Sequence, residues 1–211
     1  MRSGRGQYDV EYKNCPCFWG VEPAKYVKVL AESALPTGRQ ARALDLGAGE
    51  GKNAFFLRGK GYDVTAVEIS RYACAHFIER MIDEELDDGI TLILGDVRSV
   101  PLEPAYDVVV AYGLLHCLSS LDEVMQVVSR MQEVSRVGGI NVVSAFTNRL
   151  PVPDIQDYLS PTLLPEDHIL SLYGEHWAVL RYENDILTET HPTSNVEHQH
   201  SLFRLIARRE V

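Results

Sequence analysis

The chain has 211 residues, 45% of them hydrophobic, which is enough for one sizeable α/β core but leaves too little for two, so we expect a single domain over 1–211. Its formal net charge of -10 leaves no basic stripe to displace counterions from a phosphate backbone, so we expect no nucleic-acid partner. No apolar run approaches the length of a membrane span, and no apolar segment follows residues 1–6, so we also expect no membrane association and a cytoplasmic protein.

Apolar periodicity predicts an alternation of helices and strands over the first 146 residues. The segment that ends at Tyr112 is continuously apolar, which is typical of a central strand covered on both faces. The predicted elements, in chain order, are a helix over 22–34, a strand ending at Leu46, a helix from about Lys52, a strand over 62–68, a helix over 71–86, strands over 90–94 and 106–112, a helix over 121–135 and a strand over 140–146.

The C-terminal third departs from this alternation. Four prolines between residues 147 and 166 (Pro151, Pro153, Pro161 and Pro165) predict a long loop, followed by a helix over 166–173. Strands over 177–182 and 200–207 have no clear helix between them, so we expect an antiparallel hairpin at a sheet edge.

The most informative motif follows the first predicted strand, where glycines recur at alternate positions, Gly47, Gly49 and Gly51. They allow the backbone to turn close to a ligand. The next strand ends at Glu68, about twenty residues further on, where a carboxylate can accept hydrogen bonds from two ribose hydroxyls. This strand, glycine turn, helix, strand and acid together indicate a pocket for a nucleoside cofactor.

The spacing separates two cofactor classes. A dinucleotide site has glycines spaced G-x-G-x-x-G, whereas here the third glycine comes one residue early and Lys52 takes its place. Asp45, two residues before the first glycine, would repel a pyrophosphate and suits a cofactor that carries an ammonium and a sulfonium. The motif therefore favours S-adenosylmethionine, while NAD-type oxidoreduction and a non-catalytic cofactor-binding module remain alternatives.

At this point the chain resembles the class I S-adenosylmethionine-dependent methyltransferases, through LDLGAGEG, VTAVEIS, LGDV, YDVVVAYGLLHCL and RVGGINVVSAF. Within that family it is most similar to the tellurite-resistance and thiopurine-type group, through EGKNAFFLRGKGYDVTAVEIS, FWGVEPAKYV and HSLFRLIARR. The resemblance implies a Rossmann-like three-layer sandwich, with a seven-stranded, mostly parallel sheet that ends in an antiparallel hairpin. It covers nearly the whole chain but does not identify an acceptor.

The same resemblance implies site residues. Asp45, Gly47 and Gly49 would line the methionine end, Glu68 would hold the ribose and Tyr112 would receive the ammonium at its carbonyl. Ile69 would pack on the adenine, with Asp96 and the N–H of Val97 at its polar edge, and Trp19 and Tyr12 would fold over the cofactor as a lid. The full set expected to bind the cofactor is Trp19, Asp45, Gly47, Ala48, Gly49, Gly51, Asn53, Glu68, Ile69, Asp96, Val97 and Tyr112.

Histidines and cysteines supply the candidates for catalysis and acceptor binding. His116, just after the central strand, is the candidate general base, although it could instead cap a helix. His198 and His200 share one strand face and could contact the acceptor or a metal; we expect no resident metal. Cys15 and Cys17 could gather with Cys117 around a soft acceptor. The expected acceptor-binding residues are Tyr12, Cys117, His191, His198 and His200.

The sequence thus predicts transfer of a methyl group from S-adenosylmethionine to oxygen, sulfur, nitrogen or a metalloid of a small molecule, with S-adenosylhomocysteine as product. We expect an N-terminal lid and helix over 1–38, a cofactor-binding core over 39–146, a covering loop and helix over 147–176 and a hairpin over 177–211. A monomer or homodimer is expected. The four cysteines show no paired spacing and should remain thiols.

Overall fold

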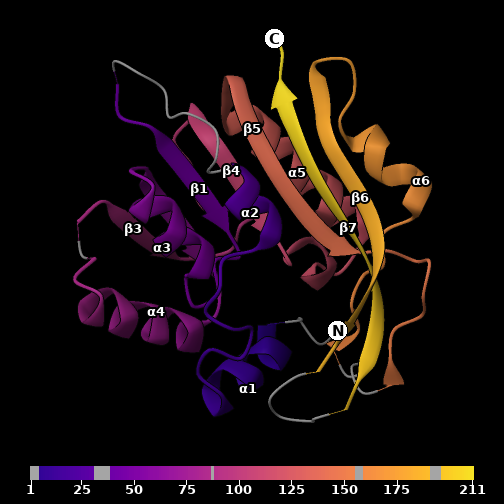
Figure 1. Cartoon of the computed structure of the whole chain (residues 1–211), viewed down its shortest axis with the longest axis horizontal. Coiled ribbons are helices and arrows are strands. Elements are labelled where there is room, and N and C mark those ends of the chain that lie inside the picture. The colour runs from indigo at the N-terminus through magenta and orange to yellow at the C-terminus, as the bar shows by residue number, and fades with distance from the viewer. Residues whose placement is uncertain (1–4, 31–38, 87, 155–158, 191–195) are drawn as a thin grey trace.

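The computed structural model describes residues 5–30, 39–86, 88–154, 159–190 and 196–211 (Figure 1). Within them one sheet has the strand order β3-β2-β1-β4-β5-β7-β6. Strands β1 to β5 are parallel, and β7 runs antiparallel between β5 and β6. This confirms the predicted sheet and its C-terminal hairpin. The strands are β1 Arg42–Leu46, β2 Asp63–Glu68, β3 Ile90–Leu94, β4 Tyr106–Tyr112, β5 Ser135–Phe146, β6 Trp177–Glu189 and β7 His198–Arg209.

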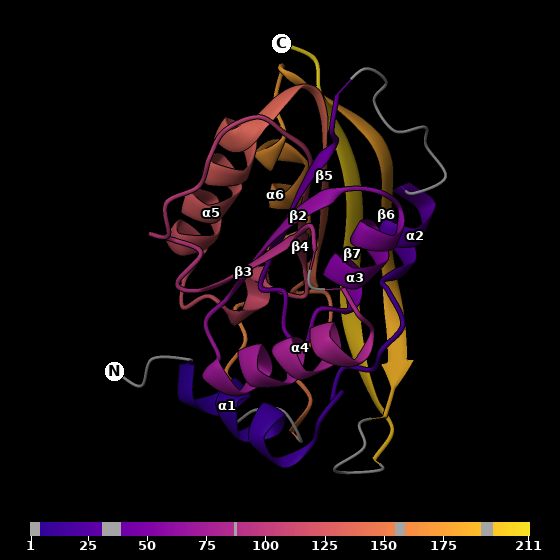
Figure 2. The ribbon, with the colours of Figure 1, turned by 90° about the vertical axis from the view of Figure 1, so that its left-hand side faces the viewer.

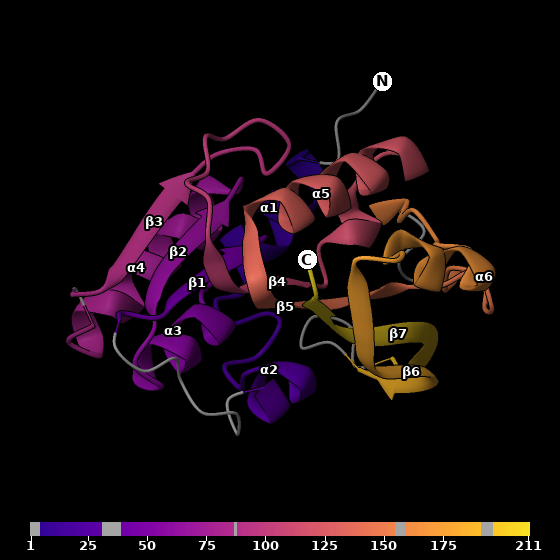
Figure 3. The same cartoon turned by 90° about the horizontal axis from the view of Figure 1, so that it is seen from above.

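Helices cover both faces of the sheet, which gives the predicted three layers (Figure 3). On one face α2 (Lys25–Leu30), α3 (Lys52–Gly59) and α4 (Arg71–Asp83) pack in one buried cluster that includes Tyr26, Phe55 and Phe77. On the other face α5 (Leu121–Val134) and α6 (Glu166–Ile169) share a second cluster with Met131 and Ile169. Figure 2 shows α5 and α3 on opposite sides of the sheet.

The centre of the sheet explains where a ligand can enter. Strand β4 is buried along its length except at Tyr112, which is half-buried, as a continuously apolar run requires. Strand β1 lies between β2 and β4. The chain adds β2 and β3 on one side of β1 and then crosses over to add β4 and β5 on the other side, so the strand order reverses at β1. Open α/β sheets bind ligands at the carboxyl end of such a switch point. The helix α1 (Arg5–Asn14) lies beyond that end of the strands (Figure 1).

Some elements differ from the sequence prediction. Helix α1 was not predicted, because its segment carries no regular apolar stripe. Strand β5 begins at Ser135 rather than at residue 140, since Ser135 pairs with Tyr106 before a bulge. Strands β6 and β7 are longer than predicted, because polar residues such as Glu183 and Asp185 continue the ladder opposite Arg204 and Leu202 where the apolar pattern stops.

The predicted helix over 166–173 is α6 followed by a 3₁₀ turn, Leu170–Leu172. Among the described helices, none combines the length and apolarity that crossing a bilayer requires.

Candidate functional site

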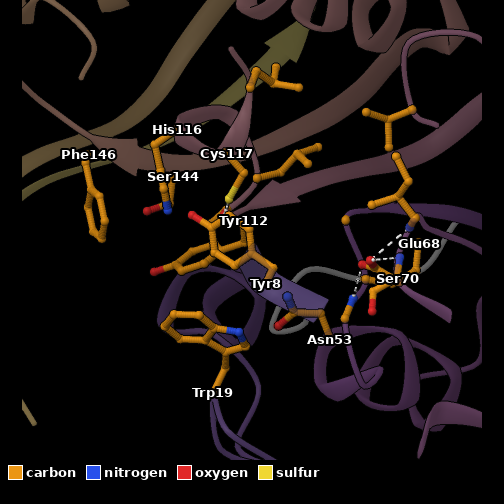
Figure 4. Close-up of a pocket in the computed structure, with 18 of the residues that line it drawn as sticks. Tyr8, Trp19, Asn53, Glu68, Ser70, Tyr112, His116, Cys117, Ser144 and Phe146 are labelled. Carbon is orange, nitrogen blue, oxygen red and sulfur yellow. Dashed lines mark hydrogen bonds between the residues drawn. The ribbon is translucent and has the colours of Figure 1, made fainter. Parts of the chain in front are cut away.

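A cavity of about 950 Å³ opens at the carboxyl ends of β1, β2 and β4. Its walls come from the turn after β1, the loop after β3, helix α1 with the segment that follows it, and the distal part of the β6–β7 hairpin. Figure 4 shows Trp19 and Tyr8 on one side of the space, Glu68 and Ser70 on another, and His116 and Phe146 at the far end. The residues predicted to bind the cofactor that line this cavity are Trp19, Gly47, Ala48, Gly49, Asn53, Glu68, Ile69, Asp96, Val97 and Tyr112.

The turn after β1 depends on glycine. Gly47, Gly49 and Gly51 all have left-handed backbones, with φ of 67°, 55° and 87°. A Cβ on Gly49 would lie 2.8 Å from the Tyr12 hydroxyl, so the bare backbone at this position makes room for the aromatic ring. A Cβ on Gly51 would lie 2.6 Å from the ring of Phe55. Gly49 therefore makes room for Tyr12 in the cavity wall, and Gly51 makes room for the aromatic packing behind that wall.

Glu68 joins this turn to the end of β2. Its Oε2 accepts a hydrogen bond from the Gly49 N–H at 2.8 Å, and its Oε1 accepts from the N–H groups of Ile69 and Ser70 at 2.8 and 2.7 Å (Figure 4). Burial raises the pKa of Glu68, and these three hydrogen bonds oppose the rise. A carboxylate offers about four acceptor positions, so about one remains for a ligand hydroxyl.

Asp45 lies behind the cavity rather than in its wall, which differs from the expectation that it lines the methionine end. The residue is only 1% exposed because it is the penultimate residue of β1, inside the sheet. Its Oδ2 has no hydrogen-bond partner among the described residues. Burial, followed by the charge of Glu68, raises the pKa of Asp45 to about 7. Gly51 does not line the cavity either. It faces the buried rings of Phe55 and Phe77.

The loop after β3 presents Asp96 and Val97 to the cavity, as predicted. Sequence reasoning missed Arg98, which lines the same wall and holds Asp96 in place. The Asp96 carboxylate accepts from the Arg98 N–H at 3.0 Å and from its guanidinium at 2.6 Å. The guanidinium also contacts Glu123, at the first turn of α5. Asp96 is thus a preoriented acceptor on the outer rim of the site.

The N-terminal segment closes another side of the cavity through Tyr8, Tyr12 and Trp19. Tyr12 is 8% exposed, and burial, then the charges of Glu68 and Cys117, raise its pKa well above the ordinary value. Tyr12 therefore stays a neutral phenol. The segment thus forms one wall of the cavity, and its role as a lid stays a prediction.

The first turn of α3 anchors that segment. The Lys52 ammonium donates to the Trp19 carbonyl at 2.7 Å, and the Asn53 side chain accepts from the Ala24 N–H at 2.9 Å. Lys52 lines the cavity too, and sequence reasoning used it only as the residue that replaces a glycine. These contacts tie the glycine turn and the N-terminal wall into one structure.

The cysteines do not gather as one candidate cluster. Cys117 lines the cavity, whereas Cys15 and Cys17 do not. The Cys17 N–H donates to the side chain of Glu50 at 2.8 Å, and Glu50 lines the cavity, so the 15–17 segment lies against the outside of that wall. Of the three thiols that the sequence left as a possible group around a soft acceptor, the structure therefore places only Cys117 in the cavity wall.

His116 lies in a 3₁₀ turn (Leu115–Cys117) after β4 and lines the cavity, as its sequence position predicted. Burial, then the charge of His200, lowers the pKa of His116 to about 3, so its imidazole is neutral over the usual pH range. Its ring stacks on Phe146 with centroids 4.0 Å apart, and Phe146 stacks on His200 at 4.1 Å. The Nδ1 atom of His116 has no hydrogen-bond partner in the described part of the chain.

The histidines of the hairpin are placed differently from the prediction. His191 lies outside the described residues. His198 and His200 are buried, at 8% and 3% exposure, and neither lines the cavity. Leu187 and Glu189, on the paired strand β6, line it instead. No signal in the apolar pattern marked these two residues, because β6 extends seven residues beyond the strand that the sequence predicted.

The segment over 147–176 was expected to cover the site, but no described residue of it lines the cavity. Ile169 and Tyr173 instead pack into the apolar cluster beneath α5. The Thr162 N–H donates to the carbonyl of His116 at 2.8 Å, so this loop supports the 3₁₀ turn from outside the cavity.

A family model described as Tellurite resistance protein TehB matches residues 26–202. A relative from Haemophilus influenzae (strain 10810), named Probable S-adenosyl-L-methionine-dependent methyltransferase TehB, is 30% identical over 154 residues, which are 72% of this chain and 51% of the relative. The chain therefore spans about half the length of the curated relatives that it matches.

Solved structures show the same fold. The crystal structure of TehB from Haemophilus influenzae matches with a TM-score of 0.73 and 21% identity, over 98% of this chain and 67% of that one. The 1,6-didemethyltoxoflavin-N1-methyltransferase of Burkholderia thailandensis, solved with 1,6-didemethyltoxoflavin and S-adenosylhomocysteine, matches with a TM-score of 0.69 and 18% identity, over 98% of this chain and 87% of that one. The sheet described above is thus the sheet of known methyltransferases.

Proposed function

The chain belongs to the TehB family, and on this premise we propose that it transfers a methyl group from S-adenosylmethionine to a small-molecule acceptor. The observation that carries the proposal is the pair of buried carboxylates at the glycine turn. Glu68 lines the cavity and Asp45 lies directly behind it. Two acids at this point disfavour a diphosphate and favour a nucleoside with positive charge.

The residues present fit such a cofactor. The Asp45 oxygen without a partner is a buried acceptor that positive charge would stabilise. The bare Gly49 backbone leaves space next to Tyr12 that a side chain would fill. We propose that Glu68 accepts from a ribose hydroxyl, that Ile69, Asp96 and Val97 hold the adenine, and that the carbonyl of Tyr112 receives the ammonium. Trp19 and Tyr12 cover the cofactor.

When bound, the cofactor supplies a methyl group on a sulfonium, which an acceptor lone pair takes by in-line displacement to leave S-adenosylhomocysteine. The protein contributes by positioning the acceptor and excluding water. Well-oriented intramolecular reactions gain up to roughly 7 to 11 kcal/mol in this way. The N-terminal wall, with Tyr8, Tyr12 and Trp19 beside the glycine turn, supplies the apolar cover that such a site needs.

His116 limits the kind of acceptor. A general base works best when its pKa lies near the operating pH, and burial holds the pKa of His116 at about 3. We propose that His116 touches and orients the acceptor as a neutral imidazole, with Cys117 beside it. The favoured acceptors are therefore those that attack without a strong base: thiolates, amines and metalloid oxyanions with a lone pair.

We further propose that the protein acts in the cytoplasm. All four cysteines are free thiols in the structure, which suits a reducing compartment.

The test is transfer of radiolabelled methyl groups from S-adenosylmethionine to a panel of thiols, amines, phenols, tellurite and arsenite. We expect label in at least one thiol, amine or metalloid, at a higher rate than in any phenol. An enzyme that binds the cofactor but labels none of the panel would contradict the acceptor assignment. Labelling of phenols alone would contradict the role given to His116.

A further inference from the structure

The distal part of the β6–β7 hairpin gathers three side chains that can bind a metal. In the antiparallel register Glu189 is paired with His198, and Leu187 is paired with His200. His198 and His200 are two residues apart on one strand, so both project from the same face of the hairpin as Glu189. Figure 1 shows this part of β6 and β7 extending past the end of the neighbouring strand β5.

The ligating atoms of the three residues converge. The Nε2 of His200 lies 3.4 Å from the Glu189 Oε1, and the Nε2 of His198 lies 3.9 Å from the same oxygen. One ligand atom from each residue lies within 4.8 Å of those of the other two. The histidine rings meet edge to face, with centroids 5.0 Å apart.

A backbone contact orients one of the rings. The Nδ1 of His198 lies 2.9 Å from the Val196 carbonyl, which can only accept, so the N–H of the ring is on Nδ1. The other ring nitrogen of His198, Nε2, is the one that faces the Glu189 carboxylate. A backbone carbonyl on the second ring nitrogen is typical of metal-binding histidines, because it fixes the orientation of the ring.

We propose that Glu189, His198 and His200 bind a divalent transition-metal ion, with Zn²⁺ as the first candidate. Two imidazoles and one carboxylate form a donor set that Zn²⁺ uses at sites with an open fourth position. Burial supports a defined site, since His198 and His200 are 8% and 3% exposed while the Glu189 side chain is 28% exposed. This replaces the sequence expectation of no resident metal, which was made without Glu189.

The position of the site gives it a link to the cavity. Glu189 lines the cavity wall, and His200 stacks on Phe146, which lines it as well. Phe146 also stacks on His116, so the cluster adjoins the end of the cavity where we place the acceptor. The inference concerns metal binding and stands whether or not the chain transfers methyl groups.

The experiment is a Zn²⁺ titration of the full chain, after treatment with a chelator and without cofactor. Cys15→Ser and Cys17→Ser are made in every sample, because these partly exposed thiols could also bind Zn²⁺. In this background we compare Glu189→Gln, His198→Gln and, as a matched control on an exposed histidine, His168→Gln. Metal content is measured by mass spectrometry and affinity by competition with a coloured chelator.

We expect one Zn²⁺ for each chain, an affinity at least about 10-fold weaker in Glu189→Gln and His198→Gln, and no change in His168→Gln. Co²⁺ should give a visible absorption band that Glu189→Gln removes. Glu189→Gln decides the question if His198→Gln does not fold, since Glu189 is partly exposed. Absence of stoichiometric binding, or equal affinity in the site variants and the control, would overturn the proposal.

Discussion

The backbone N–H of Gly49 donates to the Glu68 carboxylate at 2.8 Å, so the two motifs that the sequence separates by nineteen positions are in direct contact. Glu68 is therefore both an acceptor in the cavity wall and the residue that holds the glycine turn against β2. A change at either residue should alter the shape of the cavity as well as its chemistry.

Glu68→Ala should weaken cofactor binding by about 1.5 to 3 kcal/mol, as for hydrogen bonds to a charged acceptor. It should also lower the unfolding temperature, because three backbone N–H groups lose their acceptor. Titration calorimetry and thermal unfolding measure the two effects. Glu79→Ala, on the exposed side of α4, is the matched control and should change neither. Full affinity in Glu68→Ala would rule out the ribose role.

Gly49→Ala should impair cofactor binding more than stability, whereas Gly51→Ala should do the reverse. The added methyl group at residue 49 meets the Tyr12 hydroxyl in the cavity, and at residue 51 it meets buried aromatic rings. Overpacking of that kind costs typically about 1 to 3 kcal/mol. Gly59→Ala, in α3 with nothing within 4 Å, should be neutral or stabilising. Denaturant unfolding measures the stability of the three variants, and calorimetry measures their affinity for the cofactor. Equal stabilities and equal affinities in all three variants would contradict this account.

Asp45→Asn should stabilise the cofactor-free protein at pH 8. Because burial raises the pKa of Asp45 to about 7 from 3.8, the folded chain keeps a proton between those values that the unfolded chain releases. This group's contribution to stability is full below about pH 4 and is lost as the pH rises to about 7. The variant should therefore be more stable than wild type at pH 8 but not at pH 4.

The same variant should bind S-adenosylmethionine more weakly, because the negative charge behind the turn is gone. Urea unfolding at the two pH values and calorimetry check both effects, with exposed Asp63→Asn as the control. A stability difference that is equal at pH 4 and pH 8 would show that Asp45 does not titrate in this way.

Lys52→Met should loosen the N-terminal wall, since the ammonium no longer donates to the Trp19 carbonyl. Removing one charge-assisted hydrogen bond corresponds to about 1.5 kcal/mol, or roughly 10-fold in cofactor affinity. In a Trp177→Phe background, acrylamide should quench Trp19 fluorescence more strongly. The exposed Lys60→Met is the control. Unchanged quenching would show that the wall is held by other contacts.

His116→Gln should lower turnover by less than about 100-fold, which is the lower end for loss of a general acid or base. The wild-type rate should show no inflection near pH 6.5, because burial lowers the pKa of His116 to about 3. Turnover at saturating cofactor between pH 5.5 and 9 checks this. An acidic limb near pH 6.5 that disappears in His116→Gln would instead identify a general base.

The sequence predicted most of the sheet because the strands of a parallel core are continuously apolar and end at glycines or acids. It predicted the end of the cavity wall next to these strands for the same reason: Glu68 and Tyr112 are the last residues of such strands, and Gly49 lies in the turn after another. It could not predict that Asp45 lies behind the turn. Neighbouring residues of a strand point to opposite faces, so a shift of one residue along β1 decides whether a side chain faces the cavity or the interior of the sheet.

The part of the cavity wall that comes from the β6–β7 hairpin could not be predicted from local pattern. Glu189 and Leu187 reach the cavity through a strand whose polar residues hide it from periodicity, and their partners depend on the β6–β7 register. The packing of Tyr173 under α5 likewise keeps the described part of the segment over 147–176 out of the cavity wall, although its prolines are typical of a covering loop. Long-range pairing decides these features.

The central claim is that the cavity at the end of β1 binds a positively charged nucleoside and excludes a diphosphate. Parallel calorimetric titrations of the wild-type chain with S-adenosylmethionine and with NAD test it most directly. We predict one binding site for S-adenosylmethionine, weakened in Glu68→Ala, and no heat of binding for NAD. Binding of NAD with none of S-adenosylmethionine would contradict the account.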